Sequence, residues 1–240
     1  GWHSLFPEPA QAGIWRAMDA DRRTACHFHW HNHGYTGFEA FLQDCQPRKR
    51  KEIKRERRIT VEQGIQLKRI KAGDILPEHI SRFYLFYQLT NAKYNGHGGY
   101  LSEAFFQSLL QTMPEQMLLV FAYEDGECTA GALNFFSSST LYGRYWGCLQ
   151  ERDMLHFETC FYQGIEFCIE NGLSAFDPGA QGEHKIKRGF RPIITESFHY
   201  LAHPQFRQAV QRFLTQEQQA VLHYQKEMTG LLPFQPEAES

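Results

Sequence analysis

The sequence predicts an α/β fold in which helices flank a mixed, mostly antiparallel β-sheet. Three consecutive runs have the composition of strands, QMLLVFAYE, CTAGALNFFSS and TLYGRYWGCL. The turn between the first two contains Asp125-Gly126, a strong β-hairpin signal. Amphipathic helical stretches precede these strands, and the segment from Thr140 to Tyr200 continues as strand, helix, strand, polar loop and strand. This order favours one sheet covered by helices.

Composition limits the class of protein. The 240 residues are 42% hydrophobic and 15% aromatic, which is typical of a globular chain. The net charge of −2 gives no reason to expect a general nucleic-acid binder. Six scattered cysteines without a C-x-x-C pair favour free thiols in a reducing cytosol, so we expect a cytoplasmic protein. The sequence has no apolar run of about 18 residues and no signal-peptide pattern at its start.

Residues 1–35 are interpreted as an entry segment or the remnant of a first unit, with one short helix near residues 10–19. The stretch ACHFHWHNHGY then places four alternating histidines on one face of a predicted strand. These imidazoles are too spread for a single ion, and no carboxylate or thiolate is spaced to join them, so we predict no metal. The alternatives are a polar groove wall, with His29, Trp30 and Asn32 as candidate binding residues, or an ordinary sheet face.

Residues 36–232 are predicted to form one domain, which begins with a helix over residues 37–45. Pro47 begins a basic helix over residues 47–64, with eight Lys or Arg between Arg48 and Arg58. One interpretation is a solvated face with local ion pairs, of which Glu52–Arg55 has a favourable spacing. The other is contact with a phosphate-rich ligand such as an RNA backbone, a nucleotide or a lipid pyrophosphate.

The remaining elements follow from periodicity and caps. We predict a strand over 65–72, helices over 75–94 and 102–113, a core-facing helix over 156–172, strands over 173–179 and 192–203, a terminal helix over 204–229, and a tail over 233–240. Ser102 is the expected cap of the second of these helices.

The unusual polar residues gather in the connections between strands and helices. Because ligands usually bind where strand ends and helix starts share an edge, this is where we expect chemistry. The candidates for substrate or donor binding are Arg144, Tyr145, Trp146, His156, Gln181, Glu183, Lys185, Arg188 and His199.

Several motifs carry a resemblance to a known family. RKRKEIKRERR, YGRYWG, LHFETCFYQGIEF and FDPGAQGEHKIKRGFRP resemble the FemAB-like family, whose members are described as peptidoglycan biosynthesis or recognition factors and have the GNAT acyltransferase architecture. Similarity runs from about Cys26 to Phe234, and the chain resembles the second of two GNAT-like units with part of the first. The resemblance implies transfer of an acyl or aminoacyl group to an amine of a cell-wall precursor.

The donor is left open. In the Fem relatives a phenylalanine-lysine and glycine-phenylalanine pattern corresponds to IKRGF here, which makes Lys187 the candidate for binding an acyl carbonyl or a donor phosphate. Acetyl-CoA enzymes hold the pyrophosphate on a glycine-rich loop at a helix start, and GCLQERDMLHFE lacks those glycines. We therefore assign no cofactor. Acetyl-CoA or another acyl-CoA and aminoacyl-tRNA stay alternative donors, and tRNA is a candidate partner.

Acyl transfer needs a base for the amine and a positive group for the oxyanion. We predict Glu158 or His184 as the base and Lys187 as the electrostatic group. A capping carboxylate is the alternative for Glu158, and an ion pair with Glu158 or Asp177 is the alternative for Arg144. A cysteine nucleophile is not expected. The competing class is a non-catalytic GNAT-like module that recognises a cell-wall precursor or a protein, and a homodimer could supply a missing half-site.

Overall fold

The computed structural model describes residues 1–179 and 182–235. The chain forms two compact units, and each is assembled from segments distant in sequence. Unit 1 contains residues 1–29 and 180–232, and unit 2 contains residues 30–179 and 233–240. The predicted 36–232 domain therefore spans parts of both units.

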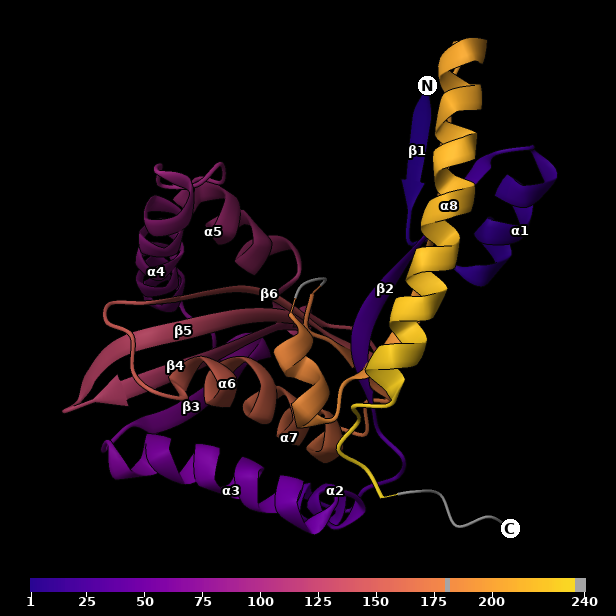
Figure 1. The fold of residues 1–240 in the computed structure, drawn as a ribbon. Coiled ribbons are helices and arrows are strands. Elements are labelled where there is room, and N and C mark those ends of the chain that lie inside the picture. The colour runs from indigo at the N-terminus through magenta and orange to yellow at the C-terminus, as the bar shows by residue number, and fades with distance from the viewer. Residues whose placement is uncertain (180–181, 236–240) are drawn as a thin grey trace. The chain divides into compact units, whose positions relative to one another are not determined.

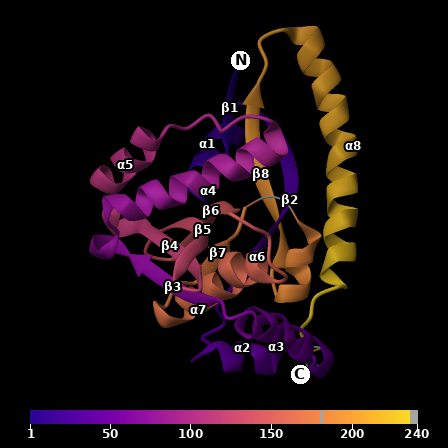
Figure 2. The same cartoon turned by 90° about the vertical axis from the view of Figure 1, so that its left-hand side faces the viewer.

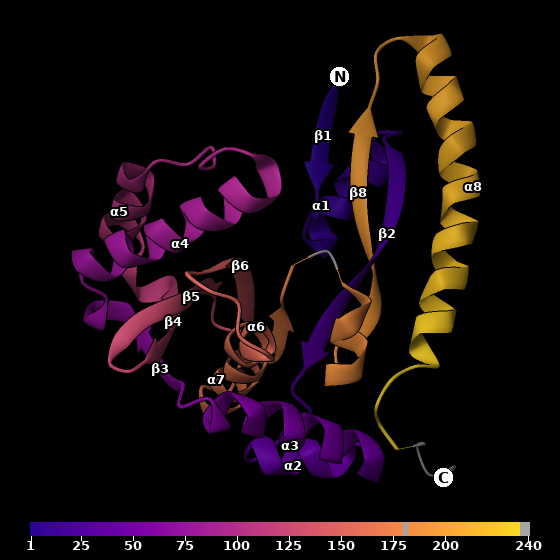
Figure 3. The same ribbon diagram turned by 60° about the vertical axis from the view of Figure 1, so that its left-hand side comes forward.

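Unit 1 is built on three antiparallel strands. Its elements are β1 (Trp2–Leu5), α1 (Pro9–Ala17), all but the end of β2 (Asp21–His31), a 3-10 turn (Glu183–Arg188), β8 (Arg191–Tyr200) and α8 (Pro204–Thr229). β8 lies between β1 and β2 (Figure 3), and its residue His199 faces His3 on one side and Asp21 on the other. α8 begins at Pro204, as predicted, and is fixed to β2 by the ion pairs Arg23–Glu217 and Arg207–Asp21.

Unit 2 contains the predicted mixed sheet. Its elements are α2 (Phe38–Asp44), α3 (Pro47–Glu62), β3 (Gln66–Lys71), α4 (Pro77–Asn95), α5 (Glu103–Thr112), β4 (Met117–Glu124), β5 (Glu127–Phe136), β6 (Thr140–Cys148), α6 (Leu155–Phe157), α7 (Gln163–Glu170) and β7 (Ala175–Asp177), with 3-10 turns at Ala72–Asp74 and Pro114–Gln116. The strand order is β7-β6-β5-β4-β3, and the last two residues of β2 pair with β7. Only the β6–β7 pair is parallel among the described strands.

Helices cover both faces of the unit 2 sheet. α4 and α5 lie over one face, α6 and α7 lie against the other, and α2 and α3 form an outer layer beyond α6 and α7 (Figures 1 and 2). An aromatic core that includes Phe83, Phe86 and Phe106 fills the space between α4, α5 and the strands. This packing holds β6 and α4 as fixed walls, because close-packed interiors permit little displacement.

Local signals confirm several predictions. The β4–β5 turn contains Asp125 and Gly126 with φ of 51° and 84°, the left-handed pair that a tight hairpin needs. The Ser102 Oγ accepts a hydrogen bond from the Phe105 backbone N–H at 3.3 Å and caps α5 as expected. The polar loop around Glu183 differs from the prediction because it forms a 3-10 turn.

Candidate functional site

β6 has an open edge in its second half. Its first three residues, Thr140 to Tyr142, pair with β7, and beyond Tyr142 its strand partner among the described residues is β5 alone. A β-bulge sets Gly143 and Tyr145 opposite consecutive residues of β5, so Arg144 is the inserted residue. Bulges are common next to functional sites because they re-aim a side chain. The bulge leaves the Arg144 side chain exposed.

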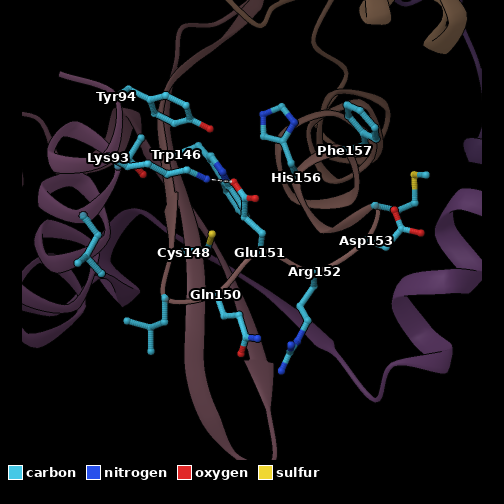
Figure 4. Close-up of a pocket in the computed structure, with 14 residues that line it drawn as sticks. Lys93, Tyr94, Trp146, Cys148, Gln150, Glu151, Arg152, Asp153, His156 and Phe157 are labelled. Carbon is cyan, nitrogen blue, oxygen red and sulfur yellow. Dashed lines mark hydrogen bonds and ion pairs between the residues drawn. The ribbon is translucent and has the colours of Figure 1, made fainter. Parts of the chain in front are cut away.

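A pocket of about 860 Å³ lies at the end of this strand. Its walls come from the C-terminal half of α4, the end of β6, the connection 149–154 and the first turn of the following helix (Figure 4). Trp146 and His156, both predicted as binding residues, line it together. The structure therefore brings these two candidates into one cavity.

Trp146 and His156 form an edge-to-face pair with ring centroids 5.5 Å apart. Trp146 packs on a buried cluster that contains Ile65, Ala122 and Leu155. Its indole is thus a firm wall, since its inner side is held by fully buried neighbours. Aromatic faces of this kind bind the apolar part or the ring of a ligand.

The charges around the pocket are balanced. Lys93 forms an ion pair with Glu151, and Arg152 donates two hydrogen bonds to each carboxylate oxygen of Glu124 over 2.9–3.2 Å. Asp153 adds a further carboxylate to the rim. Because the pocket connection holds no glycine and presents two carboxylates, it does not form a cradle for a diphosphate.

Glu158 occupies a different environment from the one predicted for a base. It is 4% exposed, and Arg57 binds both of its carboxylate oxygens, at 3.0 and 2.9 Å. Gln163 donates a further hydrogen bond at 2.8 Å, and Arg57 also binds Glu166 at 2.7 Å. We infer a structural role, because the carboxylate would have to break these contacts to take a proton.

The helix changes pitch at Glu158. Residues Glu158–Tyr162 form a π turn between α6 and α7. Such turns are rare and frequently occur at functional sites. Here the turn directs Glu158 toward α3 while His156, two residues earlier, stays in the pocket wall.

The charged residues predicted near Lys187 belong to unit 1. Lys185 and Arg188 are buried, and the Arg188 guanidinium donates to the His184 carbonyl at 2.7 Å. Glu183 accepts a hydrogen bond from the Tyr224 hydroxyl at 2.9 Å, and Gln181 lies outside the described residues. Lys187 is exposed and forms no ion pair in the part of the chain that the structure describes, which leaves its ammonium available.

The surroundings of His184 favour its neutral form. Burial lowers the pKa of this imidazole, and the nearby charges of Arg188 and Lys185 lower it further. A neutral imidazole at pH 7 is able to accept a proton. Its predicted role as a base stays a prediction.

The other predicted binding residues lie in structural positions. Trp30 is 1% exposed and packs against Phe41, so its ring is in the core of unit 2. The Asn32 side chain accepts hydrogen bonds from two backbone N–H groups and donates to the Leu173 carbonyl, which fixes a turn. His29 shares one face of β2 with two of the other histidines, whereas His33 lies past the strand end.

Three further candidates have clear neighbours. His199 Nδ1 lies 2.7 Å from His3 Nδ1, and burial followed by the His3 charge lowers the pKa of His199. Tyr145 packs edge-on against Tyr87 and Phe106 in the aromatic core. The Arg144 guanidinium lies over the Tyr145 ring and pairs with neither Glu158 nor Asp177, so the ion pairs considered for it do not form.

The basic helix uses much of its charge internally. Glu52 pairs with Arg48 at 3.4 Å and Lys49 at 3.0 Å, so the predicted Glu52–Arg55 pair is wrong. The carboxylate turns toward the preceding turn of the helix, where two cations lie within reach. Arg50 donates to backbone carbonyls at the end of α2.

Cys148 offers a chemical probe of the pocket, which it lines. Burial and the Glu151 carboxylate raise the pKa of its thiol. Because the thiolate is the reactive form, we expect alkylation of Cys148 by iodoacetamide to be slow at pH 7 and to accelerate about tenfold per pH unit up to the raised pKa. Peptide mass mapping over pH 7–10 measures this, with Cys148→Ser as the control. A rate that is independent of pH above 7 would contradict the assignment.

Comparisons with known proteins place the chain in a family. A profile of the FemAB-like family, described as peptidoglycan biosynthesis/recognition, matches residues 1–236. Among curated proteins none matches significantly. No helix in the described ranges combines the length and apolarity needed to cross a membrane.

Solved structures share the fold at low sequence identity. L-PGS from Bacillus licheniformis aligns with a TM-score of 0.57 and 11% identity over 88% of this chain and 72% of that one. FemX aligns with a TM-score of 0.54 and 13% identity over 78% of this chain and 64% of that one. The C-terminal domain of a putative lysylphosphatidylglycerol synthetase from Agrobacterium fabrum aligns with a TM-score of 0.56 and 9% identity over 82% of this chain and 66% of that one.

The predicted GNAT-like α/β fold is confirmed by the mixed, mostly antiparallel sheet with helices on both faces. With a profile match over 236 of its 240 residues, the chain belongs to the FemAB-like family.

Proposed function

We propose that the chain is an N-acyltransferase that moves an aminoacyl group from an aminoacyl-tRNA to an amine of a peptidoglycan precursor. The observation that carries the proposal is the pocket at the open end of β6, within a chain whose family is described by peptidoglycan biosynthesis/recognition. FemX, whose name has the same Fem root as the name of this family, has the same fold. Two candidate binding residues, Trp146 and His156, line the pocket, and their rings are in contact.

The chemistry is the aminolysis of an ester. The acceptor nitrogen attacks the carbonyl carbon, a C–N bond forms, and the ester C–O bond to the ribose breaks. The amine loses one proton and the ribose oxygen gains one, so protons balance and no further reactant is needed. In the proposed site the Asp153 carboxylate attracts an ammonium group, and the Trp146 ring supports the apolar part of the ligand.

The charges at the pocket favour an aminoacyl donor over acetyl-CoA. A CoA diphosphate placed at the start of the helix would meet the Asp153 carboxylate, while the cations Arg152 and Lys93 are occupied by Glu124 and Glu151. An aminoacyl group carries an ammonium that the Asp153 carboxylate attracts. The roles predicted from the sequence for Lys187 and His184, which belong to unit 1, stay predictions and are not part of the pocket in unit 2.

The test is a transfer assay on the purified chain. Aminoacyl-tRNA or acetyl-CoA is mixed with a muramyl-pentapeptide precursor, and mass spectrometry measures the product. We expect an aminoacylated precursor only from the charged tRNA, and a drop of at least tenfold in kcat/KM for Trp146→Ala, which removes a pocket wall. Tyr100→Ala is the matched control, since that aromatic side chain is 89% exposed and lies outside the pocket wall.

Each other outcome has a defined meaning. Product from acetyl-CoA alone would contradict the donor class. Precursor binding without product from either donor would replace the enzyme with the binding module considered from the sequence. Equal loss in Trp146→Ala and Tyr100→Ala would contradict the role of the pocket.

A further inference from the structure

The outward face of α3 carries four basic side chains in one row. Arg48, Lys51, Arg55 and Arg58 follow each other at steps of three, four and three residues, which places them on one side of the helix. All four are exposed. We call these four residues the basic row.

Two of the four cations in the basic row form no ion pair among the described residues. Within residues 1–179 and 182–235, Lys51 and Arg55 form no ion pair, and they stand at the centre of the row. Arg48 and Arg58 each pair with a glutamate on the same helix, at 3.4 and 3.2 Å, and these pairs are largely exposed. Exposed pairs of this kind are weak and exchange readily with other anions.

The other basic residues of α3 have partners within the protein, although Lys54 is also exposed. Their partners are carboxylates or backbone carbonyls, as seen for Lys49, Arg50, Lys54 and Arg57. Three cations of the helix, Lys49, Arg50 and Arg57, are thus partly buried, and five are exposed. Of the exposed five, Lys54 pairs with Glu39 of α2, and the other four form the basic row. Among the described residues, Lys51 and Arg55 form no ion pair that would give them a structural role.

The spacing of the row suits a nucleic-acid strand. Ten residues of α-helix separate its ends, a rise of roughly 15 Å. A duplex strand has one phosphate about every 3.4 Å along its axis, so the row spans roughly four phosphates. A row of point cations at this density matches the positioning contacts that proteins make to phosphates.

An anionic membrane is a poorer match. A helix that lies in a membrane interface inserts an apolar face beside its cations. In α3 the apolar Ile53 is buried inside unit 2, and Val61 is the exposed large apolar residue that remains among the described positions of this helix. Four charges without insertion give a membrane only weak, purely electrostatic attraction.

We propose that the basic row is the surface that docks the phosphate backbone of the tRNA donor. This rests on the proposed function, which supplies the RNA, and adds the surface that holds it. The row would contribute affinity and orientation without base reading, since phosphate contacts carry no sequence information. Because the net charge of the chain is −2, the whole protein does not attract RNA, and binding depends on a local basic patch such as this row.

The test measures binding of unacylated tRNA by fluorescence anisotropy across 50–300 mM KCl. The variant Lys51→Gln/Arg55→Gln removes the two unpaired cations. The matched control is Lys68→Gln/Arg212→Gln, which removes two exposed cations that do not belong to α3. We expect the first variant to bind at least about tenfold more weakly near 100 mM KCl. The slope of log K against log[KCl] should be smaller in magnitude by about 1.4–1.8, because each of the two lost phosphate contacts removes about 0.7–0.9.

The outcomes of this experiment distinguish failure of the docking surface from failure of the proposed function. Equal affinity and slope in the two variants would overturn the docking surface, even if the wild-type chain transfers aminoacyl groups. Failure of the wild type to bind or use tRNA would remove both proposals. If the row variant instead loses only binding to vesicles of phosphatidylglycerol and phosphatidylcholine, the row is a membrane contact and the RNA proposal is wrong.

Discussion

Replacing Arg57 with methionine is expected to lower the free energy of unfolding of unit 2 by about 3–5 kcal/mol, because it leaves a buried carboxylate without its partner. Arg57 binds Glu158, whose side chain is 5% exposed, and Glu166 at the same time. Methionine retains an apolar stem that can pack against Phe38, over which the guanidinium lies at 4.4 Å. Urea denaturation monitored by tryptophan fluorescence measures the change.

Two further variants separate this effect from a general loss of charge. Arg58→Met removes the neighbouring cation, whose pair with Glu62 is largely exposed, and should change the unfolding free energy by about 0.5 kcal/mol or less. Adding Glu158→Gln and Glu166→Gln to Arg57→Met should recover part of the loss, since no unpaired charge then remains. Equal destabilisation by Arg57→Met and Arg58→Met would contradict the role of the buried network.

The network also shows what the sequence could not predict. Arg57 and Glu158 lie 101 positions apart, and the basic run around Arg57 gives no sign that one guanidinium points inward. Glu158 and His156 are two positions apart in the predicted helix. However, two residues along a helix differ by roughly 200° in direction, so only His156 lines the pocket. The π turn that fixes this direction has no sequence signal that we recognised.

Features with local causes were predictable. The hairpin turn at Asp125-Gly126, the Ser102 cap and the helix starts at Pro47, Pro77 and Pro204 all depend on a few adjacent residues. β1 was missed because a four-residue strand at Trp2–Leu5 is specified by pairing with β8, almost 200 residues later. The same long-range pairing joins residues 1–29 and 180–232 into unit 1. Trp146 and His156 were found because each lies at a junction of strand and helix.

Gly147→Ala is the second large effect that we expect, because the backbone of α4 lies against this residue. A Cβ atom at Gly147 would stand 2.1 Å from the Phe86 carbonyl oxygen and 2.6 Å from Thr90 Oγ1. The oxygen belongs to a helix main chain, so α4 would have to move away from β6. We expect a loss of about 3 kcal/mol in unfolding free energy, at the upper end of the usual overpacking cost.

The same substitution should alter the pocket, since Thr90 and Cys148 line it from the two displaced walls. Alkylation of Cys148 at pH 8 should therefore become faster in Gly147→Ala, as the thiol gains access to solvent. Gly73→Ala is the matched control, because no atom lies within 4 Å of its added methyl group. If Gly147→Ala unfolds at the same urea concentration as Gly73→Ala and leaves the Cys148 rate unchanged, the close contact between β6 and α4 is wrong. If stability falls while the labelling rate stays constant, the strain is relieved elsewhere in α4, and the pocket wall keeps its position.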